Sequence, residues 1–272
     1  MKLAFSTLGC PGWSFREIIS TARDAGFDAI EIRGIGEQMF APDIPEFSDE
    51  KIGETLRLLA AVKLDIPVLT SGATLADPQK AQESFEEACA YIRLAPRLGA
   101  SYVRVMGTGA PQPEEGDWAL AARLYAELCA FAAPLGVTPL LETNGELASS
   151  RKMAELVRGC GAGNAGVLWD VHHTVRFAGE SPGQTAEQLG DLIRHVHLKD
   201  SVIQNGRPAY RMMGYGDIPV PEAVAALEKA GYQGYFCLEW VKRWNPDLQE
   251  PGIVFSHFKS YMDMLSRSLP PV

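Results

Sequence analysis

Short apolar runs alternate with helical patterns eight times along the chain, and this repetition restricts the fold more than any other feature. The runs cover residues 2–6, 29–33, 66–69, 102–106, 137–142, 166–170, 195–199 and 235–239. Strands that alternate with helices form parallel sheets whose faces are covered by those helices. The repetition therefore predicts an α/β fold with a parallel sheet.

The predicted helices have recognisable starts and stops. Ser14 stands three residues before Glu17 in a capping-box spacing, and Gly26 follows the predicted helix 15–25. The other predicted helices cover about 49–62, 77–98, 117–134, 150–158, 184–194, 221–230 and 253–269. Eight units without a linker predict one domain over residues 1–272, a closed (β/α)8 TIM barrel. An open doubly wound sheet is the alternative, but no strand is followed by a dinucleotide-type glycine fingerprint.

Composition limits the classes of partner. The chain carries a formal net charge of -9 and no basic run, which argues against binding a nucleic-acid backbone. Its five cysteines are scattered without CxxC spacing, so neither a disulfide framework nor a thiolate zinc site is indicated. We find no signal-peptide pattern and no apolar stretch long enough to cross a membrane. A cytoplasmic protein without nucleic-acid or membrane partners is the expectation.

Polar residues that bind metals stand at the ends of the last four apolar runs. They are Glu142, Asp170, His197 and Glu239. The carboxyl ends of barrel strands meet at one rim, where active sites of this fold are built, so these side chains should converge. A rim salt bridge would explain any one of the four residues, but it would not explain all four falling in register. Three carboxylates and an imidazole suit one divalent ion, either Mn²⁺, Mg²⁺, Co²⁺ or Zn²⁺.

Two histidines and a lysine lie close to these residues in the sequence. His195 shares a strand face with His197, but His197 is nearer the rim, so we expect His197 as the ligand and His195 as a packed neighbour. His173, three residues beyond Asp170, is favoured over its neighbour for a contact to a substrate oxygen. Lys199 is a candidate for substrate binding, although a rim ion pair with the following aspartate explains it equally well.

Residues of the first half are candidates for the walls of the site. Trp13 on the first loop could line the substrate pocket, with core packing as the alternative. Arg33 at the second strand end could contact a substrate oxygen or phosphate, or pair with Glu31. The long loops 34–48 and 201–218 are candidate lids, because long loops on this fold are often functional.

Several blocks of the chain resemble a known superfamily. They are LETN at 141–144, WDVHH at 169–173, HVHLKD at 195–200, GYGDIP at 214–219 and LEW at 238–240. The chain is similar, over essentially its whole length, to the sugar phosphate isomerase/epimerase superfamily with its xylose-isomerase-like barrel. The resemblance implies one divalent ion held by Glu142, Asp170, His197 and Glu239, with His173 hydrogen-bonded to substrate. Dimers and tetramers are common in that superfamily, so a homo-oligomer is compatible with it.

The chain departs from the ketose 3-epimerases at two positions. Ile203 stands where those enzymes carry an arginine, and Arg207 or Arg211 in the same loop could substitute for it. Ala148 stands where they carry a second glutamate. The blocks HVHLKD and GYGD resemble the inosose-dehydratase-like branch more closely.

The resemblance implies a divalent-metal-dependent isomerase or epimerase acting on a sugar or sugar phosphate. Glu142 and Glu239 would transfer the proton through an enediolate, and a small sugar or polyol would be the partner. Loss of a β-hydroxyl from the same enediolate would give an inosose-type dehydratase. An apurinic endonuclease is a rival, but its extra histidines at the third and fourth strand ends are missing here. A non-catalytic sugar-binding barrel is the other rival, although both candidate bases are present.

Overall fold

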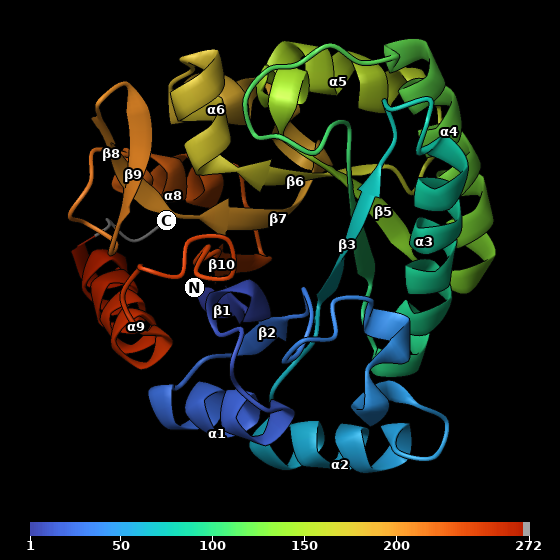
Figure 1. Ribbon diagram of the computed structural model, residues 1–272. Helices are drawn as coiled ribbons and strands as arrows, with labels where there is room; N and C mark the ends of the chain where they lie inside the picture. The colour runs from blue at the N-terminus through green and yellow to red at the C-terminus, as the bar shows by residue number, and fades with distance from the viewer. Residues whose placement is uncertain (269–272) are drawn as a thin grey trace.

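The computed structural model describes residues 1–268, and it contains a barrel of parallel strands surrounded by helices (Figure 1). The barrel strands are β1 (Lys2–Ser6), β2 (Ala29–Glu31), β3 (Val68–Thr74), β4 (Tyr102–Met106), β5 (Thr138–Glu142), β6 (Gly166–Asp170), β7 (Ile193–Leu198) and β10 (Tyr235–Leu238). Their order around the barrel is β2-β1-β10-β7-β6-β5-β4-β3. Two parallel bridges, Ala29 to Asp65 and Ile32 to Leu69, bring β2 next to β3 and nearly close the barrel. The predicted TIM barrel is confirmed.

The surrounding helices follow the strands in the expected alternation. They are α1 (Phe15–Ala25), α2 (Ile52–Val62), α3 (Ala81–Leu94), α4 (Trp118–Ala132), α5 (Ser150–Gly159), α6 (Val171–Ala178), α7 (Pro182–Leu189), α8 (Val220–Lys229) and α9 (Pro251–Ser268). The capping box of α1 forms, and Gly26 ends that helix in the left-handed conformation with φ 76°. The predicted end of the last helix at Leu269 lies outside the described residues.

The segment between β6 and β7 differs from its prediction. We expected one helix over 184–194, but α6 begins directly after Asp170, α7 ends at Leu189, and β7 begins at Ile193. Leu189, Leu192 and Ile193 keep a helical spacing, which explains the prediction of a longer helix. Gly190 ends α7, and a short 3-10 turn leads into the strand. The site residue His173 therefore lies in the first turn of a helix rather than in a loop.

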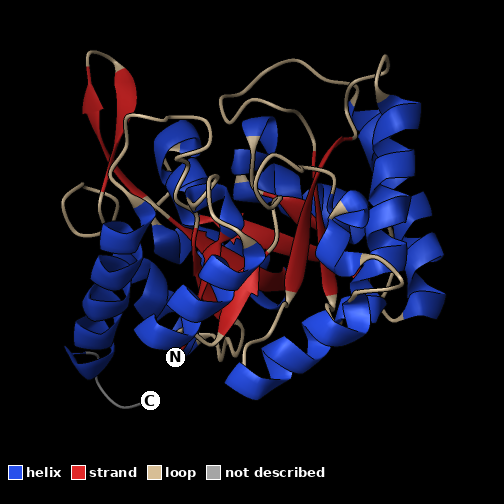
Figure 2. Cartoon of the chain, turned by 60° about the horizontal axis from the view of Figure 1, so that its bottom comes forward, coloured by secondary structure: helices blue, strands red, loops and turns tan. Residues whose placement is uncertain are grey.

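The segment after β7 also has more structure than expected. Residues predicted as an irregular lid form an antiparallel hairpin of β8 (Asp200–Gln204) and β9 (Arg207–Arg211). Asn205 and Gly206 connect the strands with φ values of 52° and 74°, the turn conformation that an Asn-Gly pair favours. Figure 2 shows the hairpin standing out from the barrel at its upper left.

Aromatic packing fixes the last helix against the first strand. The ring of Phe5 stacks on Phe255 with centroids 4.1 Å apart, and Phe27 stacks on Phe258 at 6.3 Å. These pairs bury the apolar face of α9 and help to close the chain around the barrel. Among the described residues, no helix combines the length and the apolar composition needed to cross a bilayer.

Candidate metal centre and active-site cavity

A cavity of about 1060 Å³ opens at the carboxyl ends of the barrel strands. Of the residues predicted for the site, six line it: Arg33, Glu142, His173, Lys199, Arg207 and Glu239. Segments that the sequence had not suggested complete its wall, namely the loop after β4 and residues Val241, Trp244 and Asn245 after β10. The hairpin contributes Ile203 and Tyr210, so this predicted lid segment does border the cavity.

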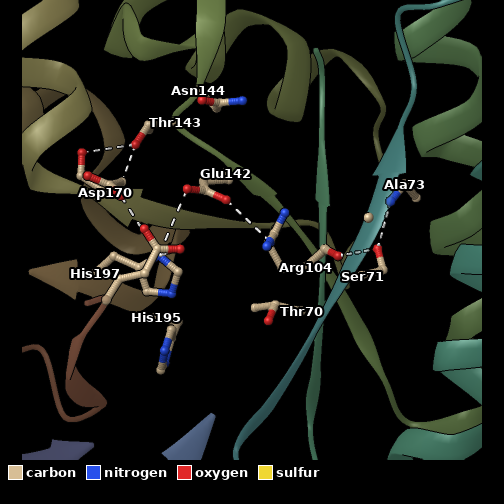
Figure 3. A network of polar contacts seen from close by, with 12 residues as sticks. Thr70, Ser71, Ala73, Arg104, Glu142, Thr143, Asn144, Asp170, His195 and His197 are labelled. Atoms are coloured by element: carbon tan, nitrogen blue, oxygen red, sulfur yellow. Dashed lines mark hydrogen bonds and ion pairs between the residues drawn. The ribbon is translucent and has the colours of Figure 1, made fainter. Parts of the chain in front are cut away.

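Four predicted ligands converge on one point at the base of this cavity. Glu142 ends β5, Asp170 ends β6, His197 lies near the end of β7, and Glu239 follows β10. One ligand atom from each lies within 4.8 Å of the others, and all four residues are buried. Asp170 and His197 are direct register partners on neighbouring strands. Figure 3 shows Glu142, Asp170 and His197 turned toward one another.

Asp170 uses its two carboxylate oxygens differently. Oδ1 accepts a hydrogen bond from the backbone N–H of His173 at 3.0 Å and thereby caps α6. The Asp170 backbone N–H donates to Thr143 Oγ1 at 2.8 Å, which fixes the end of the strand. Oδ2 is left to face the site, 3.8 Å from His197 Nδ1. One oxygen thus positions the residue, and the other faces the site, where Lys199 Nζ lies 2.5 Å from it.

A residue that the sequence suggested only as a partner for Arg33 holds His197 in place. Glu31, fully buried at the end of β2, accepts hydrogen bonds through Oε2 from His197 Nε2 at 2.6 Å and His195 Nε2 at 3.1 Å. The other ring nitrogen of His197, Nδ1, faces Glu239 Oε1 at 3.4 Å and Glu142 Oε1 at 3.9 Å. A carboxylate behind a histidine is the usual arrangement for orienting a metal-binding imidazole. His195 is a packed neighbour, as predicted, and it shares the same acceptor.

The acids around His197 control its protonation. Burial by itself lowers the pKa of His197, but the carboxylates of Glu31 and Glu239 outweigh burial and raise the pKa to about 9. Burial likewise raises the pKa of Glu31, but His197 and His195 outweigh it, and the pKa lies well below the usual range. Glu31 is therefore a carboxylate at neutral pH, and a cation must displace one proton to reach Nδ1.

A rim ion pair between Lys199 and Asp200 was one of the two alternatives that the sequence suggested. These two residues do not form it. Lys199 Nζ lies 2.5 Å from Asp170 Oδ2 and also contacts Glu239 Oε2. Asp200 instead accepts backbone N–H groups of Ser201, Gly214, Gly216 and Ile218 at 2.8–3.2 Å. A Cβ on Gly216 would lie 2.0 Å from Asp200 Oδ1, so glycine is required there. Asp200 shapes the loop after the hairpin, while Lys199 belongs to the site.

The two candidate bases have different electrostatic surroundings. Burial raises the pKa of Glu142 to about 6, although Arg104, whose Nε lies 3.2 Å from Glu142 Oε2, opposes this effect. Burial also raises the pKa of Glu239, but Lys199 and His197 outweigh it and bring the value to about 2. Glu142 is thus the more basic carboxylate of the pair.

The histidines of α6 are both neutral. Burial, assisted by Lys199, holds the pKa of His173 well below its usual value, and burial lowers that of His172 to about 2. His173 Nδ1 lies 3.0 Å from the carbonyl of Thr143, which only accepts, so Nδ1 carries the proton and Nε2 is an acceptor. His172 Nε2 is bonded to Ser201 Oγ at 2.9 Å. Only His173 lines the cavity.

Two predicted substrate contacts do not line the cavity. Trp13 packs edge-on against Phe255 with centroids 5.7 Å apart, the core-packing alternative. Arg211 donates to Tyr210 O and Gln204 Oε1 within the hairpin. The loop 34–48, a predicted lid, contributes no residue to the lining. Two cationic residues of the lining were missed: Arg104 within β4 and Arg176 on α6, although a charge inside an apolar strand is a readable signal for Arg104.

The donor set fits a divalent ion. Within residues 1–268, His197 Nδ1 and Asp170 Oδ2 are buried and have no hydrogen-bond partner, although Lys199 Nζ lies close to the latter. The carboxylates of Asp170, Glu142 and Glu239, with His197 Nδ1 once its proton is displaced, make a donor set that suits a hard or borderline cation. A second group, formed by Glu31, His195, His197 and Cys237, fits less well, because Glu31 is engaged by both histidines and burial raises the pKa of the Cys237 thiol.

Known proteins are similar to this chain in sequence or in fold. The chain is 24% identical to fructoselysine 3-epimerase of Shigella flexneri, over 93% of this chain and 94% of that protein. The solved structure of the IOLI protein with a bound zinc atom matches with a TM-score of 0.82 at 18% identity and covers all of both chains. The probable 3-DHS dehydratase AsbF of Bacillus anthracis matches with a TM-score of 0.78 at 18% identity, over 97% of this chain and 99% of that one.

A family model covers most of the chain. The model of the xylose isomerase-like TIM barrel matches residues 19–256, which include every candidate ligand. The match agrees with the closed order of the strands and confirms the resemblance drawn from the sequence blocks. The chain belongs to the xylose isomerase-like TIM barrel family.

Proposed function

We propose that this protein is a divalent-metal-dependent isomerase or epimerase that acts on a sugar or a sugar derivative. The observation that carries the proposal is the convergence of Glu142, Asp170, His197 and Glu239 within 4.8 Å at the base of a cavity large enough for a small sugar. The 24% identity to a fructoselysine 3-epimerase supports the reaction class. The four residues would hold one ion, with His197 binding through Nδ1.

The bound ion would supply Lewis acidity, which stabilises negative charge on substrate oxygens while a proton leaves the neighbouring carbon. Glu142 would accept that proton, because burial makes it the more basic carboxylate of the pair before the ion binds. Glu239 would return a proton from its own side of the cavity. Two carboxylates on opposite faces of one carbon give epimerisation, whereas one carboxylate that serves two carbons gives isomerisation.

Other residues of the cavity would orient the substrate. The unprotonated Nε2 of His173 can accept a hydrogen bond from a substrate hydroxyl, because Thr143 fixes the proton on Nδ1. Lys199 keeps its charge, because burial lowers its pKa but Asp170 and Glu239 outweigh burial and raise it well above the usual value. Its ammonium group can donate to a substrate oxygen near Glu239. Ile203 and Tyr210 of the hairpin would shield the reacting carbon from water.

Dehydration is the second candidate function. It starts with the same proton removal and continues with loss of a hydroxyl from the next carbon. The structural match to a probable 3-DHS dehydratase supports dehydration as the second candidate function. Product analysis distinguishes the two reactions, because epimerisation and isomerisation conserve mass while dehydration releases water.

The proposal is tested by loading the protein with Mn²⁺, Mg²⁺, Co²⁺ or Zn²⁺ and screening ketoses, hydroxypyruvate and inososes by NMR. We expect turnover that disappears with chelator and returns with the ion. A protein that binds no divalent ion, and whose Glu239→Gln variant behaves as the wild type, would contradict the proposal. Cleavage of abasic DNA would instead favour the nuclease, for which no histidine is available before His172.

A further inference from the structure

The charge of the cavity is opposite to that of the whole chain. The protein has a net charge of -9, yet its cavity is lined by five cationic side chains and only two carboxylates. The cations are Arg33, Arg104, Arg176, Lys199 and Arg207. The carboxylates are Glu142 and Glu239, both of which are candidate metal ligands. When these two acids hold an ion, no carboxylate of the lining remains to balance the arginines.

Two of these cations already have partners. Arg176 donates to Ser201 and forms an ion pair with Asp217, while Lys199 contacts Asp170 and Glu239. Arg207 lies exposed on the hairpin, where water can solvate it. Arg33 and Arg104 therefore remain as the cations whose partners need explanation.

Arg104 is buried with unused donors. It is 4% exposed, and its Nε and Nη1 make no hydrogen bond within the described part of the chain. Its contact with Glu142 joins a single nitrogen and a single oxygen 3.2 Å apart, as Figure 3 shows. A guanidinium that served only to neutralise Glu142 would be expected to make the paired hydrogen bonds that its planar fork allows. Buried N–H donors without acceptors are costly, so they indicate a missing acceptor.

Arg33 lies at the same level of the barrel, two strands away. On one side of β3, Ile32 pairs with Leu69, so the next residue, Arg33, lies beside Thr70. On the other side of β3, Arg104 pairs with Thr70. Arg33 and Arg104 therefore flank Thr70. Arg33 shares its strand face with Glu31, whose side chain points inward to the histidines. A Cβ on Gly72 would lie 3.3 Å from Arg33 Nη2, so this glycine leaves room for the guanidinium.

Arg33 also lacks an ion pair. Among residues 1–268, no carboxylate lies within 4.0 Å of its guanidinium, and the nearby Glu87 accepts the backbone N–H of Gly72 at 2.5 Å. Burial, together with the neighbouring charge of Arg104, lowers the pKa of Arg33. Two guanidinium groups at one level repel each other, and an anion between them would relieve that repulsion.

We infer that Arg33 and Arg104 form an anion subsite, and that the substrate carries a carboxylate or a phosphate, which would lie beside Glu142 on the β2 and β4 side of the cavity. This inference rests on the proposed function, because it assigns a substrate class to the same cavity. It adds that neutral ketoses and polyols bind more weakly than ligands of the same size that carry an anionic group. Arg33 would be a substrate-binding residue for the anionic group, and Arg104 would bind both the anion and Glu142.

The test compares five-carbon ligands that differ in charge: xylitol, xylonate and xylulose 5-phosphate. Their dissociation constants are measured by calorimetry at constant ionic strength, with Mn²⁺-loaded protein and again in the presence of chelator. We expect at least one of the two anions to bind about tenfold or more tightly than xylitol, as a charged hydrogen-bond pair implies. The tighter of the two anions identifies the carboxylate or the phosphate as the natural group.

Arg33→Gln is the informative variant, because Arg104 also contacts Glu142. It should reduce the preference for the anion to within about threefold while Mn²⁺ binding is unchanged. The matched control is Arg194→Gln, at the opposite end of the barrel, where the arginine donates to Asp191 O. This control should keep the full preference.

The possible outcomes separate the two proposals. Equal binding of xylitol and the anions, no binding of either anion, or an unchanged preference in Arg33→Gln would overturn the anion subsite. Anion preference in a protein that binds no Mn²⁺ would support the subsite and contradict the proposed metal-dependent reaction. Mn²⁺ binding without anion preference would contradict the anion subsite and remain in agreement with the proposed metal-dependent reaction.

Discussion

The two ends of the barrel carry cavities of similar size but opposite character. The cavity at the carboxyl ends of the strands holds buried carboxylates, histidines and an arginine with unpaired donors or acceptors. The cavity at the amino ends, about 850 Å³, is lined mainly by leucines, glycines and tyrosines, and its charged residues are Lys2, Asp65, Asp191 and Arg194. None of its polar side-chain atoms is buried without a partner among the described residues; for example, Tyr232 donates to Tyr235 O at 3.0 Å, and Tyr235 donates to Asp65 at 2.5 Å.

The difference between the ends shows where binding sites should be sought in this chain. Unpaired buried polar atoms lower stability, so their concentration at one end calls for a ligand there. The amino end has the volume for a ligand but no such atoms among the described residues. Substitutions at the carboxyl end should therefore mainly change ligand binding, whereas substitutions at the amino end should change only the stability of the fold.

The largest expected effect is on catalysis by Glu239→Gln. The amide keeps an oxygen but loses the charge and the basicity of the carboxylate, so we expect turnover to fall by about a thousandfold or more. Steady-state kinetics on the substrate found by the screen measures this effect. Glu222→Gln on the exposed face of α8 is the matched control and should leave turnover unchanged. Comparable turnover in both variants would remove Glu239 from the reaction.

The next effect concerns the residue behind the metal-binding histidine. Glu31→Gln removes the carboxylate that accepts from His197 Nε2, so the amide no longer fixes that tautomer as firmly. We expect Mn²⁺ affinity to fall by about 10–100-fold, as is typical for such outer partners. Calorimetry measures the affinity, and ¹⁵N chemical shifts of His197 report the tautomer. Unchanged affinity together with an unchanged tautomer would contradict this role.

The pH dependence of metal binding should follow the two shifted ligands. His197, with a pKa of about 9, holds a proton that the ion must displace, so affinity should rise about tenfold per pH unit between pH 6 and 9. Below about pH 6 Glu142 also takes up a proton, and affinity should then fall about a hundredfold per unit. Calorimetry in buffers of different ionisation enthalpy counts the released protons. An affinity that is flat from pH 6 to 9 would exclude the protonated His197.

The smallest effect is expected at the amino end. Tyr235→Phe removes the hydrogen bond to Asp65 without changing the ring. We expect unfolding in urea to show a loss of about 1 kcal/mol, with metal affinity unchanged. A change in metal affinity as large as that of Glu31→Gln would mean that the two ends of the barrel are coupled.

The sequence predicted the parts of the site that follow from strand order alone. Glu142, Asp170, His197 and Glu239 stand at the ends of consecutive strands, and parallel strands in a barrel bring their carboxyl ends to one rim. Their approach to within 4.8 Å could be anticipated from the strand order, without knowledge of the side-chain conformations. The fold class followed from the same alternation.

The sequence did not predict the residues inside the strands. Parallel strands are apolar on both faces, so periodicity does not reveal which face of β2 or β4 points inward. Glu31 and Arg104 were therefore not placed with His197 and Glu142, although each is a charge within an apolar run. The boundaries of α6, α7 and the hairpin were missed because local capping and the Asn-Gly turn outweighed the longer hydrophobic pattern.

The proposed function depends most directly on one ion held by four residues. Anomalous diffraction from crystals soaked in Mn²⁺ would locate that ion independently of any substrate. We predict a single strong peak about 2.0–2.3 Å from Glu142, Asp170, Glu239 and Nδ1 of His197. No peak at this position, or a peak beside His195 and Cys237 instead, would contradict the account.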